Sequence, residues 1–366
     1  MVVVRAAVRD RWLPWRVARR LDLARYWHRH GDLDEAARHA EHALRLVAAA
    51  GSVPATVQAD AAVTAAEIDR DRDDSAVGRT RLEHAVQLLD AAPPAARRAR
   101  VLVRALTGLG DCHRRGGRYP QASAALQRAR ALAEASDAPD PMQLAAVLTV
   151  LGITAKELGA YEQAARCYAE VDAIYREHAA APGDRATLQH NLAGLAHAQR
   201  QYPQAESHAR RAVELRGRAA AAQVEFAADL AVLGAAIAAQ DRHDEAREQL
   251  RRALASCAAA RPPRRYEVAV QLHNLAAIDQ ADGRPDDAEQ GYRRALAVKE
   301  QLLGSEHPEV GLVCNNLGTL LHDQHRDSEA RSCYLRALAI AERVYPAGHP
   351  TTTAVRHNLH RLTEPG

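Results

Sequence analysis

The sequence predicts an all-α fold, a right-handed superhelical solenoid of antiparallel helix pairs, and three observations support this prediction. The chain of 366 residues exceeds the size at which one globular core usually stops growing, yet no linker divides it. Its hydrophobic fraction of 47% is rich in alanine, the residue with the highest helix propensity, and only 4% of residues are aromatic. Finally, one sequence pattern recurs along most of the chain. A long undivided chain with such a repeat is typical of an array in which each unit packs mainly on its neighbours.

The repeat is anchored by an alanine and a leucine in a constant register. Six segments related to GRYPQA each end in an alanine, 41 or 42 residues after the previous one: Ala122, Ala164, Ala205, Ala246, Ala288 and Ala330. Upstream of each alanine is a leucine that is followed by glycine or alanine: Leu109, Leu151, Leu192, Leu233, Leu275 and Leu317. A generic amphipathic bundle would not keep one register over six units, so the pattern indicates a structural repeat.

Each unit is expected to form two amphipathic helices. The first contains the leucine and the small residue, and a turn with glycine or a polar cluster follows it. The second begins with acidic residues or proline, which suit a helix N-terminus, and it buries the turn alanine. Four residues after that alanine comes a larger residue that is also expected to be buried: Leu126, Tyr168, Leu250, Tyr292 or Tyr334.

We therefore divide the chain into ten segments. Residues 1–16 form a basic and aromatic N-terminal segment, and residues 351–366 contain a single helix that caps the last apolar face. Between them lie eight helix pairs, at 17–58, 59–102, 103–144, 145–185, 186–226, 227–268, 269–310 and 311–350. The second pair is degenerate, because Gly78 occupies the position of the turn alanine.

The Leu-Gly pair, the G-x-x-x-x-A turn and the Ala-x-x-x-aromatic spacing resemble the tetratricopeptide repeat. The 41- to 42-residue period and the segments ALAVKEQLLGSEHPEV (295–310) and ALAIAERVYPAGHPTTT (337–353) resemble its kinesin-light-chain subtype, which is widespread in bacterial scaffold and signalling proteins. The resemblance implies a non-catalytic protein that binds a partner in a concave groove. No heptad-patterned segment precedes the repeats, so we expect the cargo-binding module rather than a motor subunit.

Asparagines mark the candidate peptide-binding groove. The chain contains five: Asn191, Asn274, Asn316 and Asn358, each one residue before a leucine of the repeat register, and Asn315 one position earlier. Asparagine is unfavourable inside helices, so its repeated placement needs a reason. First helices line the concave wall of such a solenoid, where an amide can bond both the N–H and the C=O of an extended peptide. The family resemblance implies this role at this register, and a bridge between adjacent repeats is the alternative.

Further residues of the groove floor follow from the same register. Six are polar: His190, His273 and His357 one residue before the asparagine register, and His197, Gln280 and His322 later on the same helices. The sixth repeat instead has Val232, Ala235 and Ala238, which form an apolar pocket or reflect simple drift. Earlier repeats carry charges there: Arg104, Asp111, Arg114, Arg115, Lys156 and Glu157. An acidic partner suits the arginines, but solvation of an exposed helix face is the simpler interpretation.

Metal, cofactor and catalytic sites are not predicted. The H-x-x-H pairs His39/His42, His322/His325 and His357/His360 lack a third and a fourth ligand. The sequence has no G-x-x-x-x-G-K-[ST], G-x-S-x-G or dinucleotide-binding glycine motif. Its five cysteines form no C-x-x-C pair, which favours reduced thiols in the cytoplasm.

Charge and hydropathy restrict the expected partners. The formal net charge of +3 predicts no affinity for nucleic acid, and no apolar run is long enough to span a membrane. We therefore expect a scaffold that binds an extended protein or peptide segment in the groove of the fifth to eighth repeats. The alternative is a ligand- or peptide-responsive regulatory sensor that controls a separate effector, an ATPase or a transcription regulator. Both functions leave oligomerisation open.

Overall fold

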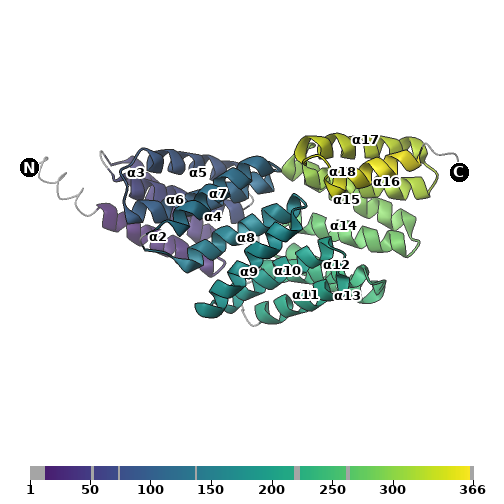
Figure 1. Cartoon of the computed structure of the whole chain (residues 1–366), viewed down its shortest axis with the longest axis horizontal. Helices are drawn as coiled ribbons and strands as arrows, with labels where there is room; N and C mark the ends of the chain where they lie inside the picture. The colour runs from purple at the N-terminus through teal and green to yellow at the C-terminus, as the bar shows by residue number, and fades with distance from the viewer. Residues whose placement is uncertain are drawn as a thin grey trace, which may run out of the picture. The chain divides into compact units, whose positions relative to one another are not determined.

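A computed structural model describes residues 13–50, 53–72, 75–136, 138–217, 223–260 and 264–362. Regular structure in these ranges is helical throughout, with seventeen helices, α2 to α18, in succession (Figure 1). This confirms the predicted all-α fold of paired helices. Residues 1–12, most of the predicted N-terminal segment, lie outside the described ranges. None of the described helices has both the length and the hydrophobicity to cross a membrane.

The chain divides into two compact units, Met1–Leu151 and Gly152–Gly366. The first contains α2 (Leu13–Arg29), α3 (Leu33–Ala48), α4 (Ala55–Asp71), α5 (Ser75–Asp90), α6 (Ala96–Arg115) and α7 (Tyr119–Glu134). The boundary falls within α8 (Pro141–Glu157). The second contains α9 (Tyr161–Glu177), α10 (Pro182–Ala198), α11 (Tyr202–Arg216), α12 (Gln223–Ala238), α13 (His243–Ala259), α14 (Arg265–Ala281), α15 (Pro285–Leu303), α16 (Pro308–Asp323), α17 (Asp327–Val344) and α18 (Pro350–Arg361).

The two helices of a pair meet where a small residue faces a large one. A Cβ atom at Gly110 of α6 would lie 2.5 Å from Cγ of Leu126 in α7. A Cβ at Gly152 would lie 2.4 Å from the ring of Tyr168, and the same contact recurs between Gly318 and Tyr334. The six turn alanines are fully buried: Ala122, Ala164, Ala205, Ala246, Ala288 and Ala330. The sequence repeat therefore encodes one close-packed interhelical contact, which recurs in the pairs α6/α7, α8/α9, α12/α13 and α16/α17.

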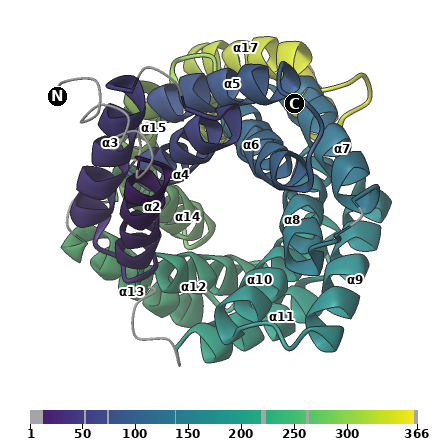
Figure 2. The same cartoon turned by 90° about the vertical axis from the view of Figure 1, so that its left-hand side faces the viewer.

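Neighbouring first helices also contact one another, which places them on the inner side of the curve in each unit. Contacts join α2 to α4 and α4 to α6 in the first unit, and α10, α12, α14 and α16 in succession in the second. Figure 2 shows α4 and α6 inside α5 and α7, and α10 and α12 inside α11 and α13. We call α2, α4 and α6 the inner wall of the first unit. The inner wall of the second unit consists of residues 152–157 of α8 together with α10, α12, α14, α16 and α18.

The first helices begin earlier than the predicted segment boundaries. Helix α10 begins at Pro182 rather than at 186, and α16 begins at Pro308 rather than at 311. Helix α2 begins at Leu13, inside the segment predicted to precede the repeats. The register leucine locates the middle of a helix, whereas proline at the first helical position marks its start, as Pro141 does for α8 and Pro350 for α18.

Two histidines that precede prolines cap helices. Nδ1 of His307 accepts a hydrogen bond from the backbone N–H of Glu309 at the start of α16, with an N–N distance of 3.2 Å. His349 does the same for the N–H of Thr351 at the start of α18, also at 3.2 Å. Each histidine thereby satisfies one of the backbone donors that a helix N-terminus leaves without a partner. The two His-Pro dipeptides of the long repeat period are therefore helix start signals.

Apart from the turn between α4 and α5, which is only partly described, each turn within a pair contains a residue with a left-handed backbone conformation. Glycine occupies it in several turns, with φ of 68° at Gly117, 75° at Gly159 and 70° at Gly283. Residues with a Cβ atom occupy the equivalent place elsewhere, with φ of 60° at Asp241 and 61° at His325. Positive φ is costly for such residues, so these turns are held by the packing of the two helices that they connect.

Candidate functional site

The asparagines lie on the inner wall of the second unit, one first helix after another. Asn191 belongs to α10, Asn274 to α14, Asn315 and Asn316 to α16, and Asn358 to α18. All five side chains are half-buried. Such side chains pack against their neighbours on the wall and remain partly accessible to solvent.

Three of the asparagines form a chain of hydrogen bonds across neighbouring first helices. Nδ2 of Asn358 donates to Oδ1 of Asn315 at 3.0 Å, and Nδ2 of Asn315 donates to Oδ1 of Asn316 at 3.3 Å. Nδ2 of Asn316 then donates to Nε2 of His273 at 3.1 Å. The chain links α18, α16 and α14, so these amides bridge adjacent repeats.

His273, which was predicted for the groove floor, lies beneath the inner wall. Its side chain is buried and contacts the ring of Tyr292 edge to face, with centroids 5.5 Å apart. Burial, reinforced by the charge of Lys299, lowers the pKa of His273 to about 4. Because Nε2 accepts the hydrogen bond from Asn316, the proton of this neutral ring is on Nδ1, which has no hydrogen-bond partner. The residue therefore acts in packing and in positioning Asn316.

His190 is engaged in an ion network between α10 and α12. Its Nδ1 lies 3.0 Å from Oδ1 of Asp229, a carboxylate that is fully buried. The other oxygen of Asp229 accepts from Nε of Arg216 at 2.8 Å. A buried carboxylate needs such partners to remain charged. His190 is thus one of the hydrogen-bond partners of the buried Asp229.

The remaining predicted groove residues differ in their surroundings. Gln280 accepts from the hydroxyl of Tyr292 at 3.2 Å and donates to Asp323 at 3.0 Å. Nδ1 of His322 lies 2.8 Å from the carboxylate of Asp327. The ring of His197 lies edge-on to Tyr202, with centroids 5.4 Å apart, and His357 is exposed.

A group of donors without acceptors lies between α8 and α10. Nδ2 of Asn191 is buried and has no hydrogen-bond partner. Lys156 reaches across from α8, because a Cβ at Gly194 of α10 would lie 3.5 Å from its Nζ. Burial and the charge of Lys156 lower the pKa of His197. Among the described residues, neither Lys156 nor Asn274 has a hydrogen-bond or ion-pair partner.

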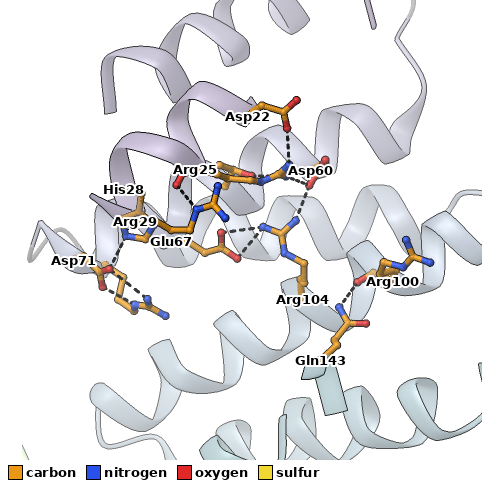
Figure 3. A network of polar contacts seen from close by, with 12 residues as sticks. Asp22, Arg25, His28, Arg29, Asp60, Glu67, Asp71, Arg100, Arg104 and Gln143 are labelled. Carbon is orange, nitrogen blue, oxygen red and sulfur yellow. Dashed lines mark hydrogen bonds and ion pairs between the residues drawn. The ribbon is translucent and has the colours of Figure 1, made fainter. Parts of the chain in front are cut away.

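The charged residues of the first unit form a connected set that the sequence pattern did not reveal. Arg25 of α2 and Arg104 of α6 converge on Asp60 of α4, at N–O distances of 2.6 and 2.7 Å (Figure 3). Arg104 also binds both oxygens of Glu67 at 2.9 Å. The expectation that Arg104 is a solvated helix-face charge is therefore corrected, because it binds carboxylates of a neighbouring helix. The available signal was Asp60 itself, a carboxylate within an apolar helical run.

A second group of charges surrounds Asp111 of α6. Its carboxylate binds Arg114 at 2.7 Å and Arg115 at 3.3 Å. These arginines lower the pKa of Asp111 to about 2, although burial acts in the opposite direction. Both arginines are thus engaged within their own helix.

The sixth repeat shows packing at the three positions that lack polar residues. Val232 and Ala238 pack against a cluster around Leu233 and Ile237. Ala235 is half-buried. The apolar side of α12 therefore belongs largely to the core of the second unit.

Metal-binding and nucleophilic groups are not assembled in the part of the chain that the structure describes. Within it, no three His, Cys, Asp or Glu side chains come together as a set of metal ligands. Burial raises the pKa of the Cys112, Cys257 and Cys314 thiols to about 11. Protonated, buried thiols are poor nucleophiles, and these cysteines act as small packing residues.

Repeated helix pairs with a polar inner wall define the class of helix-repeat proteins that present extended concave surfaces to partners. The chain belongs to the tetratricopeptide repeat family. That family matches residues 101–177, 224–301 and 267–343, and a second description of the same repeat matches residues 185–220. The resemblance recognised in the sequence is thus confirmed. Comparison with curated proteins gave no match.

Several solved structures are similar to this chain. A Rap protein complexed with competence and sporulation factor is 12% identical over 96% of this chain and 98% of that one, with a TM-score of 0.66. NprR in complex with its cognate peptide NprX is 11% identical over 82% of each chain, with a TM-score of 0.59. BtubC (BKLC) from P. vanneervenii is 24% identical over 64% of this chain and 92% of that one, with a TM-score of 0.48. At 11 and 12% identity, the likenesses to Rap and NprR establish the fold.

Proposed function

We propose that the inner wall of the second unit binds an extended segment of a partner polypeptide. The observation that most strongly supports this proposal is a set of hydrogen-bond donors on α8, α10 and α14 that have no acceptor: Lys156, Asn191 and Asn274. Unsatisfied polar groups are costly when water is excluded, and a peptide supplies a regular row of carbonyl oxygens. According to this proposal, the protein is a non-catalytic interaction scaffold.

The asparagines divide into two groups in this proposal. Asn315, Asn316 and Asn358 use part of their hydrogen-bonding capacity to hold neighbouring first helices in register. Asn191 and Asn274 keep theirs for the ligand. Rap and NprR, which have this fold, were solved with competence and sporulation factor and with a peptide, respectively, which supports the choice of a peptide ligand.

The proposal is tested by site-specific photocrosslinking in extracts of the native host. A photoreactive residue at position 274 should capture the partner, whereas one at Arg294 on the second helix of the same repeat should not. Asn191→Ala and Asn274→Ala should each weaken binding of the captured partner without lowering the melting temperature. Equal capture from positions 274 and 294 would contradict binding at the inner wall.

A second candidate function is a peptide-responsive regulator of a separate effector. The observation that favours it is a contact between distant parts of the second unit. His349 caps α18, and its Nε2 atom lies 3.0 Å from the backbone oxygen of Glu157 at the end of α8. A ligand that changed the curvature of the intervening repeats would make or break this contact. Small-angle scattering with and without the captured partner distinguishes the functions, because a passive scaffold keeps its radius of gyration.

A further inference from the structure

A basic pocket opens on the inner wall of the first unit, in a part of the molecule that the proposed function does not use. It has a volume of about 350 Å³ and is lined by Arg25, Asp60, Arg97, Arg100, Val101 and Arg104. Three first helices contribute these residues, namely α2, α4 and α6. The lining of the pocket thus contains four arginines and one carboxylate, Asp60.

The ion pairs of the pocket leave two of its arginines without a counter-charge. Asp60 is shared by Arg25 and Arg104, and Arg104 is further paired with Glu67. Arg97 and Arg100 form no ion pair with any described residue, and both are exposed. The backbone oxygen of Arg100 accepts a hydrogen bond from Gln143 at 2.8 Å, so the start of α6 is held in place (Figure 3).

The position of these two arginines is electrostatically unfavourable in the free protein. They lie three residues apart on one helix face, where like charges repel. They also lie at the N-terminal end of α6, whose first turn has no acidic residue and whose N-cap residue, Ala95, provides no side-chain cap. The positive end of the helix dipole and the uncapped N–H groups both favour an anion there.

We infer that this pocket binds adjacent carboxylates of an acidic protein segment. A carboxylate pairs with a guanidinium through two parallel hydrogen bonds, and two such groups match Arg97 and Arg100. Asp60 lines the pocket beside them, Glu67 lies further along α4, and both carboxylates repel a long polyanion. A short acidic cluster therefore fits this wall better than a nucleic acid strand does.

The test measures fluorescence anisotropy with the full chain and labelled, C-terminally amidated peptides. One contains four consecutive glutamates between Gly-Ser flanks, and its matched control contains four glutamines. The glutamate peptide should bind at least about tenfold more tightly than the glutamine peptide, in a salt-dependent manner. Arg97→Gln together with Arg100→Gln should weaken its binding about tenfold or more, because hydrogen bonds to charged groups are lost.

The control variant is Arg166→Gln with Arg176→Gln, which removes the same charge from α9. These side chains are 69 and 72% exposed and form only local pairs within that helix. Equal weakening by the control variant would show binding to overall charge and would overturn the inference. Stability gives a second readout, because removing Arg97 and Arg100 should leave the melting temperature unchanged or raise it. A structural role would lower it.

Two further arms distinguish the chemistry of the ligand. A peptide with phosphoserines in place of the glutamates would bind tenfold more tightly if the pocket were a phosphate site, and that result would overturn the carboxylate assignment. Displacement of the glutamate peptide by an equimolar single-stranded oligonucleotide would favour a nucleic acid site instead. Asn191→Ala and Asn274→Ala should not change the affinity for the glutamate peptide, so each of the two proposed sites can be disproved independently of the other.

Discussion

The amide of Asn316 donates to Nε2 of buried His273, 3.1 Å away on the neighbouring first helix. This hydrogen bond joins an asparagine of the repeat register to the neighbouring first helix and so stabilises the inner wall. It requires a neutral imidazole, because a ring protonated on both nitrogens cannot accept. Its geometry also shows that Asn316 stabilises the packing of neighbouring first helices.

Unfolding should become easier below neutral pH because of His273. The pKa of this residue is about 4 in the folded protein and near 6.5 in the unfolded chain, so the unfolded state binds more protons between these values. Its contribution is fully present above the unfolded pKa and is lost as the pH falls from 6.5 toward 4. Between pH 7.5 and 5 we expect it to remove about 2 kcal/mol of the free energy of unfolding.

Urea denaturation of the parent and of His273→Gln at both pH values measures this loss. The variant cannot take up this proton, so its free energy of unfolding should fall by about 2 kcal/mol less than that of the parent. Identical pH dependence in the two proteins would show that other groups are responsible.

Replacement of the two kinds of asparagine should have unequal effects on stability. Asn316→Ala leaves the acceptor of His273 buried without a donor and should cost about 1–3 kcal/mol. Asn274→Ala removes no hydrogen bond to a described residue and should change stability by less than about 0.5 kcal/mol. Thermal denaturation of both variants under identical conditions provides the comparison. If Asn274→Ala lowered the melting temperature as much as Asn316→Ala, the proposed division would be wrong.

The contact between Gly152 and Tyr168 should not tolerate a methyl group. A Cβ at position 152 would lie 2.4 Å from Cε1 of the buried ring, so Gly152→Ala should destabilise the protein by about 1–3 kcal/mol. Gly183→Ala is the matched control, since no atom lies within 4 Å of its added Cβ and alanine favours the helix. Urea midpoints that shift in the same direction for both variants would contradict this account of the repeat.

The left-handed turn residues offer a stabilising change. His325 adopts φ of 61° where Gly283 adopts 70° in the preceding repeat. His325→Gly should therefore raise the free energy of unfolding by about 1 kcal/mol, and Gly283→Ala should lower it by a similar amount. Neither change introduces a clash, because nothing lies within 4 Å of a Cβ at position 283 and His325→Gly only removes atoms. A destabilised His325→Gly protein would mean that the imidazole makes a compensating interaction.

The two capping histidines allow the contact between α8 and α18 to be measured. His307→Ala removes a helix cap, which should cost about 1 kcal/mol. His349→Ala removes an equivalent cap, the hydrogen bond to Glu157 and the stacking on Tyr345, whose ring centroid lies 4.0 Å away. Its melting temperature should fall further than that of His307→Ala. Equal decreases would show that the contact adds nothing to the stability of the second unit.

The sequence by itself determined the fold, because the information for each helix pair is local. A leucine and a small residue in one helix, followed by a buried alanine and a large residue in the next, encode a contact such as that of Gly110 with Leu126. The helix starts were also encoded locally, by prolines such as Pro182, but the leucine register alone did not reveal them. The pattern likewise located the asparagines on first helices, because their spacing equals the repeat period.

Only the tertiary structure decided which polar groups are engaged. Register alone pairs Asn316 with Asn274, yet the offset between neighbouring first helices brings His273 to it, 43 residues away. The same offset joins Asn358 to Asn315 and leaves Asn274 without a described partner. In the first unit, helix packing gathered Arg25, Asp60 and Arg104 from three helices. A displacement of one residue between helices is invisible in a periodic sequence, but it determines which donors and charges remain available to a ligand.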